Sequence, residues 1–279
     1  MGISTKHKLY NFVADLRKEL GITLSNYPVD AIDICGNLPN TELRQRKFNT
    51  NGLCGAIMMG NKSDVIILNS NRNAGEMNFD CAHEITHKFK HRGKGIDSFS
   101  CVNLKTQRDP SVSFFEWEAN EGGAELLVPF CLLLPRIASY WPFKSWQDIV
   151  AMKEDLSYEF GVSPAVIHYR CESLRYEIHQ YLSGLPLSAV EVISNTEQKN
   201  RRIKVKSIDD IENEMLEKEW QDDLPTPSDA PPERIARKEP LAAESQVVRH
   251  AHSSKEPLKM SPELQASFAK AEEQWLYGF

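Results

Sequence analysis

The sequence has little that would suit a membrane or secreted protein. The apolar stretch 126–134 is far shorter than the roughly 20 residues that a span requires, and Pro129 interrupts it. The first 20 residues mix Lys6, Asp15 and Arg17 with apolar side chains, which is typical of an amphipathic helix and not of a signal peptide. We therefore expect a cytoplasmic protein.

Paired cysteines are also missing. The six cysteines stand at positions 35, 54, 81, 101, 131 and 171, and no two of them form a C-x-x-C pair. This scatter fits a reducing cytosol better than a disulfide framework or a cysteine-based zinc site.

An excess of positive charge is absent as well. The 33 Lys and Arg residues and 39 Asp and Glu residues give a net charge of −6. The chain as a whole therefore lacks the excess positive charge that is typical of nucleic-acid-binding proteins, although a local basic face is not excluded. With 279 residues, of which 41% are hydrophobic and 26% charged, the composition is that of a soluble globular protein with one substantial core.

The composition changes near residue 190. After Asn195 the chain carries mixed charges and then the proline-rich segment 223–233, which is too polar to pack. We predict a folded unit over residues 1–190 and a largely disordered tail over residues 191–279. Two tail segments, 208–220 and 262–277, can form short helices, and the aromatic end of the second is typical of a partner-docking segment or a disordered terminus.

Local patterns predict an α+β fold that is mainly helical with a small sheet. Two opening helices and two strands of a hairpin are expected at residues 9–20, 28–36, 53–59 and 64–69. Asn73 followed by Glu76 resembles a capping box, so one continuous helix is expected from Ala74 to about His91.

This expected helix contains His83-Glu84-Ile85-Thr86-His87, an H-E-x-x-H pattern. Successive helical residues rotate by about 100° and rise by about 1.5 Å, so His83 and His87 lie one turn apart on one face and can bind one Zn²⁺. Glu84 lies beside that face, where its carboxylate can take a proton from a water that the metal activates. The pattern alone occurs by chance in on the order of one chain in a hundred, so its context must support it.

A catalytic zinc takes three protein ligands, and the third is not on the motif helix. His91 is eight residues from His83, about 12 Å along a straight helix, which is too far for bonds near 2 Å. The longer pattern H-E-x-x-H-x-x-G-x-x-H is absent, because Lys90 and Gly93 occupy its glycine and final histidine positions. A carboxylate from a second helix is the remaining standard solution.

That helix is expected downstream, with Asp109 as N-cap and Pro110 as first helical residue. It carries four glutamates, and a helical wheel places one of them on a small, apolar face and the other three opposite. Glu116 shares its face with Ala119, Asn120, Gly123 and Leu127, whereas Glu118, Glu121 and Glu125 lie on the other side. Small residues at 119 and 123 would let the two helices approach closely, and Asn120 is placed to hydrogen-bond a metal ligand. The alternative is that Glu116 completes a capping box with Ser113 and that the other acids form a solvated face.

The two segments together resemble the ImmA/IrrE family of zinc metallopeptidases. The family signature is H-E-L-G-H followed by E-x-x-A-[ND]-x-F-A-x-x-L-L-x-P, matched here by residues 83–87 and 116–129, with Asn69 and His91 also fitting. The resemblance covers roughly residues 20–180, including a helical C-terminal part at about 144–184. It implies a zincin-like domain, zinc ligands His83, His87 and Glu116, and Glu84 as general base.

Three departures from the family pattern stand out. Thr86 replaces the usual glycine, Gly122 replaces the usual phenylalanine, and the arginine common just upstream of the motif is missing around residues 76–78. None of these positions is a predicted ligand.

The resemblance implies site-specific proteolysis inside the cell, with a helix-turn-helix repressor as the substrate and a mobile genetic element or stress response as the setting. The hairpin at residues 53–69 is expected to offer an edge strand for an extended substrate segment. Candidates for stabilising the oxyanion are Tyr140, His168, Tyr169 and Arg170, although for each of them a core or surface role is favoured.

Two alternatives remain open. Ser145 and Ser163 can cap two successive helices broken at Gly161, which resembles a helix-turn-helix with Arg170 and Arg175 on its second helix. Because only these two basic residues are expected to point outward, the sequence gives this DNA-binding or regulatory module little support for direct reading of DNA. The other alternative is a zinc-containing module that binds a partner without cutting it.

Overall fold

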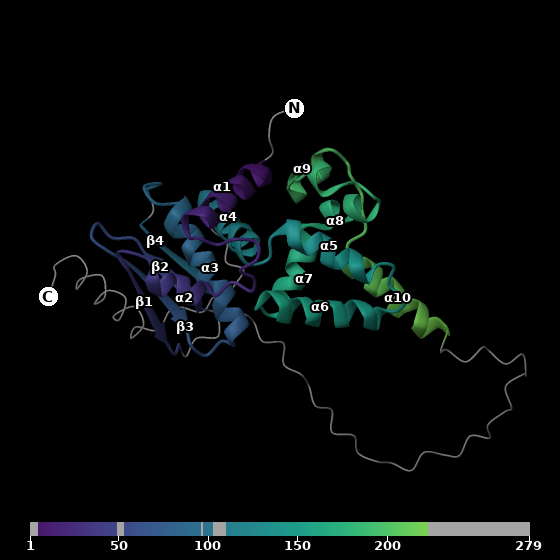
Figure 1. Cartoon of the computed structure of the whole chain (residues 1–279), viewed down its shortest axis with the longest axis horizontal. Coiled ribbons are helices and arrows are strands. Elements are labelled where there is room, and N and C mark those ends of the chain that lie inside the picture. Colours follow the sequence, from purple (N-terminus) through teal and green to yellow (C-terminus); the bar gives the residue numbers. More distant parts are fainter. Residues whose placement is uncertain (1–4, 49–52, 96, 103–109, 223–279) are drawn as a thin grey trace, which may run out of the picture. The chain divides into compact units, whose positions relative to one another are not determined.

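The computed structural model describes residues 5–48, 53–95, 97–102 and 110–222, which all fall within one compact unit, Met1–Thr226. The elements are α1 (Thr5–Glu19), α2 (Ala31–Asn37), β1 (Thr41–Arg46), β2 (Leu53–Met58), β3 (Asp64–Asn69), α3 (Ala74–Lys90), β4 (Ser98–Val102), α4 (Pro110–Leu127), α5 (Phe130–Tyr140), α6 (Trp146–Phe160), α7 (Pro164–Ser173), α8 (Arg175–Leu182), the 3₁₀ turn η1 (Leu187–Ala189), α9 (Asn195–Asn200) and α10 (Ile208–Asp222) (Figure 1). The fold is α+β and mainly helical with a small sheet, as predicted.

The sheet has four strands in the order β1-β3-β2-β4. The expected hairpin is confirmed, because β2 and β3 pair antiparallel with Ile57 opposite Ile66. Both of these strands are interior, however, since β1 pairs with β3 in parallel and β4 pairs with β2 antiparallel. The expectation that the hairpin supplies an edge strand is therefore wrong: among the described strands, the edges are β1 and β4.

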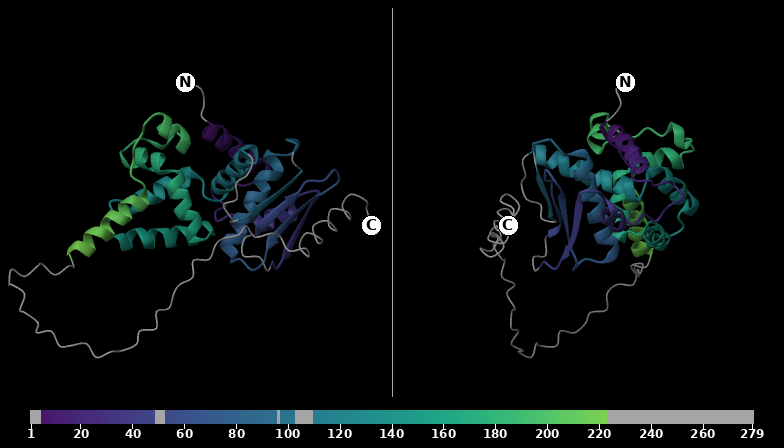
Figure 2. Two further views of the ribbon diagram at one scale, coloured as in Figure 1. Left: turned by 180° about the vertical axis from the view of Figure 1, so that it is seen from behind. Right: turned by 60° about the vertical axis from the view of Figure 1, so that its left-hand side comes forward.

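Helix α3, which contains the H-E-x-x-H motif, begins with the predicted capping box. The backbone N–H of Glu76 donates to Asn73 Oδ1 at 2.9 Å, and the backbone N–H of Asn73 donates to Glu76 Oε2 at 3.1 Å. The helix packs across β2 and β3, with α2 and α4 against its other sides (Figures 1 and 2). As a result, all seven residues from Cys81 to His87 are buried, so the motif lies inside the core.

The compact unit extends beyond the boundary expected at residue 190. Ile208, at the start of α10, is 2% exposed, and Lys153 of α6 binds both Asp209 and Glu212 of α10 at 2.6 Å. The helix expected at 208–220 is thus confirmed and packs on α6 and α7. The helix expected at 262–277 lies outside the described residues.

Helices α6 and α7 are two successive helices broken at Gly161, as expected. Ser145 forms a capping box with Asp148, and Gly161 ends α6 with a left-handed φ of 64°. Arg170 does not point outward, however, because it is 1% exposed and its guanidinium binds glutamates of α4. Arg175 belongs to α8, so α7 does not present the pair of outward arginines that the DNA-binding alternative required.

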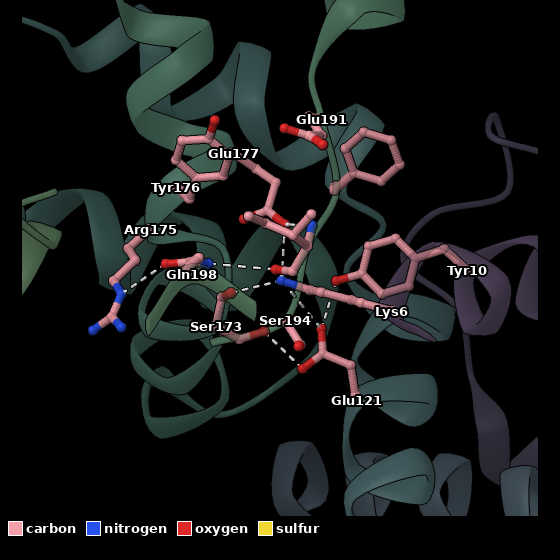
Figure 3. A network of polar contacts seen from close by, with 12 residues as sticks. Lys6, Tyr10, Glu121, Ser173, Arg175, Tyr176, Glu177, Glu191, Ser194 and Gln198 are labelled. Carbon is pink, nitrogen blue, oxygen red and sulfur yellow. Dashed lines mark hydrogen bonds and ion pairs between the residues drawn. The ribbon is translucent and has the colours of Figure 1, made fainter. Parts of the chain in front are cut away.

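The acids on the far side of α4 are buried, not solvated. Glu121 accepts hydrogen bonds from Tyr10 at 2.5 Å, Arg170 at 2.7 Å and Ser173 at 2.6 Å. Lys6 of α1 binds Glu177 of α8 at 3.0 Å and lies 4.0 Å from Glu121 (Figure 3). The alternative of a solvated acidic face is therefore wrong, and these ion pairs tie α1, α7 and α8 to α4.

Among the described residues, no single helix has the length and apolar character needed to cross a membrane. One bent pair, Ser113–Leu127 with Phe130–Tyr140, meets the length and composition criteria together, at an angle of 65°.

Candidate metal centre

The first turn of the motif brings two histidines together in the core. His83 Nε2 and His87 Nε2 lie 3.0 Å apart, and neither residue is exposed. The spacing of four residues on a regular helix is sufficient to produce this arrangement.

Glu116 comes to the same point from α4. Its Oε2 lies 3.6 Å from His83 Nε2, and its Oε1 lies 3.8 Å from His87 Nε2. Zinc bonds of about 2.0–2.1 Å at tetrahedral angles would separate donor atoms by about 3.3 Å, so these three side chains fit one zinc ion. The alternative in which Glu116 caps the helix with Ser113 is wrong, because α4 begins at Pro110 and Ser113 lies inside it.

The approach of α4 to α3 depends on small residues, as the helical wheel predicted. Ala119 is fully buried, and a Cβ added at Gly123 would lie 2.9 Å from the backbone nitrogen of His83. Such a contact is closer than van der Waals packing allows, so only glycine at 123 lets α4 carry Glu116 this near to the histidines.

Glu84 is a fully buried carboxylate beside the two histidines. One of its oxygens lies within 4.8 Å of a ligating nitrogen of each histidine, and no hydrogen-bond partner for either oxygen exists among the described residues. Burial, and next the nearby charge of Glu116, raise the pKa of Glu84 well above its usual value. A buried carboxylate without a protein partner is costly, and a cation between Glu84, His83 and His87 would offset that cost.

Gly55 of β2 makes room for this carboxylate. A Cβ at position 55 would lie 3.1 Å from Glu84 Oε1, which is a tight contact. The Glu84 side chain extends from α3, and strand β2 restricts the position of its carboxylate on one side.

Each histidine also has a partner for its other ring nitrogen. His83 Nδ1 lies 3.0 Å from Asn120 Oδ1, where the wheel placed Asn120, and His87 Nδ1 lies 2.8 Å from His91 Nδ1. His91 therefore stands behind His87 and not beside the three convergent donors. Its i+4 spacing from His87 is the sequence signal for this contact.

Aromatic rings close one side of the site. Phe99 of β4 stacks on the His87 ring with centroids 4.0 Å apart, and Phe115 packs on the His91 ring at 4.8 Å. Edge strand β4 consequently lies directly against the histidines.

Three of the four oxyanion candidates bind partners away from these residues. Tyr140 donates to Asp155 at 3.0 Å, His168 lies 3.1 Å from Asp209, and Arg170 binds Glu121. Tyr169 is 70% exposed on α7.

Comparison with known proteins points to one family. Residues 37–172 match the model of peptidase family M78, described as the IrrE N-terminal-like domain. The match runs from the end of α2 into α7 and includes His83, Glu84, His87 and Glu116. The search of curated proteins found no match.

Proposed function

We propose that this chain, which matches the IrrE N-terminal-like peptidase model over residues 37–172, is a zinc-dependent endopeptidase of the ImmA/IrrE family that cleaves a protein substrate at a specific site. The observation that carries the proposal is the convergence of His83, His87 and Glu116 next to the unpartnered carboxylate of Glu84. Family membership alone makes the chain a peptidase; this geometry supports the choice of metal and the role of each residue.

In this proposal His83, His87 and Glu116 hold Zn²⁺. Two imidazoles and one carboxylate are a ligand set that zinc peptidases use, and they leave one position open. When bound, zinc supplies a Lewis acid that polarises the scissile carbonyl and makes water acidic enough to be deprotonated near neutral pH.

Glu84 moves the proton in the same proposal. Its carboxylate takes a proton from the attacking water and delivers it to the nitrogen of the departing amine, as a general base and then a general acid. Burial between α3 and Gly55 keeps bulk water from solvating the carboxylate and restricts its position.

The edge of β4 is the place that we propose for the substrate main chain. The strand pairs with β2 along one side, and Phe99 within it stacks on His87. An extended segment that adds to the outer side of β4 would run past the histidines and could be held by main-chain hydrogen bonds alone. This replaces the interior hairpin as the substrate strand.

A helix-turn-helix repressor is the substrate that the family resemblance implies, and we keep it as the proposed target. The DNA-binding alternative loses its main support, because Arg170 is buried and the acidic helix α10 packs on α7. The alternative of a non-cleaving zinc module shares the same metal site and has to be separated by experiment.

The test uses the full chain and a repressor encoded next to it. We expect about one zinc per chain in both the wild type and Glu84→Gln, and cleavage by the wild type only. Glu154→Gln changes the same side chain at an exposed position of α6 and should cleave like the wild type. Equal cleavage by Glu84→Gln, or a wild type without zinc, would overturn the proposal. Zinc binding without any cleavage by the wild type would favour the non-cleaving module.

A further inference from the structure

Behind His87 lies a third buried histidine, which takes no part in the proposed chemistry. His91, the C-cap of α3, is 1% exposed, and its Nδ1 lies 2.8 Å from His87 Nδ1. Its other nitrogen, Nε2, lies 3.1 Å from Glu118 Oε2 on α4. Both ring nitrogens of His91 are therefore within hydrogen-bond distance of a partner.

When His87 holds a metal through Nε2, only one arrangement of protons forms both hydrogen bonds, from His87 to His91 and from His91 to Glu118. A neutral imidazole that ligates through Nε2 carries its proton on Nδ1. That N–H must donate to His91 Nδ1, which is then the unprotonated nitrogen of its ring. His91 must carry its own proton on Nε2, from which it donates to the carboxylate of Glu118.

We propose that His91 and Glu118 are positioning residues that fix the tautomer and the ring orientation of His87 for metal binding. The proposal rests on the metal site of the proposed function. A partner behind a ligand histidine raises the basicity of the ligating nitrogen and prevents the ring from turning away. Asn120 stands in the equivalent place behind His83, so both ligand histidines have an acceptor for their Nδ1–H.

Packing alone does not account for a histidine at position 91. The ring lies between Phe99, at 5.6 Å, and Phe115, at 4.8 Å between centroids, an apolar setting in which phenylalanine would pack equally well. Burying two ring nitrogens there is favourable only if both are hydrogen-bonded. The polar chain from His87 to Glu118 satisfies that condition.

Glu118 is itself held in place. It is 8% exposed, and Lys90 Nζ lies 3.7 Å from its Oε1 while also standing over the Phe12 ring at 4.8 Å. The ion pair with Lys90 restrains the Glu118 carboxylate at the place where it can accept from the His91 N–H.

The main test is zinc affinity, measured by competition with a chromogenic chelator. We expect His91→Phe to weaken zinc binding by about 10- to 100-fold, because it keeps the ring packing and removes the acceptor. Glu118→Gln keeps the side-chain size and one acceptor oxygen, so a smaller loss in the same direction is expected. His168→Phe is the matched control: it also removes a histidine from a carboxylate, Asp209, but one that is away from the site, and should leave affinity unchanged.

A second readout needs no variant and covers the case in which His91→Phe does not fold. Nitrogen-15 NMR of the imidazoles in the zinc-loaded wild type should show His87 protonated on Nδ1 and His91 neutral and protonated on Nε2. A His91 ring with its proton on Nδ1 would overturn the proposal.

The two proposals fail in different ways. A wild type that binds no zinc overturns the proposed function and this inference with it. A wild type that binds zinc, with His91→Phe and Glu118→Gln binding equally tightly, overturns this inference and leaves the proposed function intact.

Discussion

Gly122 of α4 lies directly against Thr86 of α3: a Cβ added at position 122 would be 2.7 Å from Thr86 Cγ2. These are two of the positions at which the chain departs from the family signature. The signature has glycine where this chain has Thr86, and phenylalanine where it has Gly122. Bulk is therefore present on α3 where the family has none, and absent from α4 where the family has a ring. The two departures compensate for each other within one helix interface.

The first prediction is that the effect of Gly122→Ala on the free energy of unfolding changes sign with the residue at position 86. In the wild type it should lower the free energy of unfolding by about 1–3 kcal/mol, because the new methyl overpacks against Thr86 Cγ2. Thr86→Ser removes that methyl and keeps the hydroxyl that donates to Ala82 O at 2.9 Å. In this background Gly122→Ala should be neutral or stabilising by up to about 1 kcal/mol, since alanine is the better helix former.

A double-mutant cycle by urea unfolding measures this coupling. Gly36→Ala in α2, where a Cβ would meet nothing within 4 Å, controls for the gain in helix propensity. Additive effects of the two changes would contradict the compensation.

A second prediction concerns Gly123, where the close contact of an added methyl group cannot be relieved by a change in a neighbouring side chain. A Cβ there would meet backbone atoms, His83 N at 2.9 Å and Ala82 C at 3.1 Å, and no side-chain change removes them. We expect Gly123→Ala to push α4 away from α3, to destabilise the fold by about 2 kcal/mol or more, and to weaken zinc binding because Glu116 moves with the helix. The measurements are urea unfolding in chelator and zinc competition on the folded fraction; unchanged zinc affinity would show that the approach of α4 does not set the site.

Local signals predicted the parts of the structure that depend on neighbouring residues. The capping box at Asn73 and Glu76, and the small face of α4 at Ala119 and Gly123, are short-range patterns and were predicted correctly. Strand β1 could not be predicted in the same way, because its exposed face carries charged and polar residues and it joins the sheet only through β3.

The buried ion pairs could not be predicted from local sequence patterns, for a different reason. A glutamate on the polar side of a helical wheel is expected to be solvated unless a cation is known to reach it. Arg170 is 49 residues from Glu121 along the chain, and Lys6 is 171 residues from Glu177. Only the folded arrangement brings these charges together, so the burial of Glu121 could not be read from α4 alone.

A third prediction uses the pH dependence of this network. Burial raises the pKa of Glu121, but Lys6 and Arg170 outweigh it and lower the pKa from 4.5 to about 2. A carboxylate with a depressed folded-state pKa stabilises the protein above its ordinary pKa, and that stabilisation is lost as pH falls from about 4.5 towards about 2. The difference in unfolding free energy between wild type and Glu121→Gln should therefore shrink by about 2 kcal/mol between pH 6 and pH 3.

Urea unfolding at both pH values, in chelator, gives this difference. Groups that titrate equally in both proteins cancel, and the exposed Glu154→Gln should show a difference that stays constant within about 0.5 kcal/mol. A constant difference for Glu121→Gln as well would mean that Lys6 and Arg170 do not hold Glu121 ionised.

The last prediction concerns the effect of Glu84 on stability, apart from the role proposed for it in the reaction. Burial, and then the charge of Glu116, raise the pKa of Glu84 in the metal-free protein. Ionisation of Glu84 therefore opposes folding once the pH exceeds the ordinary pKa of a glutamate. Glu84→Gln removes that charge. In chelator the variant should therefore melt above the wild type at pH 8, and the gap should narrow at pH 5, where the folded wild type can keep the carboxyl protonated.

Zinc should change this comparison, because a cation beside Glu84 favours its charged form and removes most of the cost. Saturating zinc is expected to raise the melting temperature of the wild type more than that of Glu84→Gln, although both bind the ion. If the variant is less stable than the wild type in chelator at pH 8, the unpartnered carboxylate is not a source of instability. Position 84 would then be one where the proposed general base carries no cost in stability.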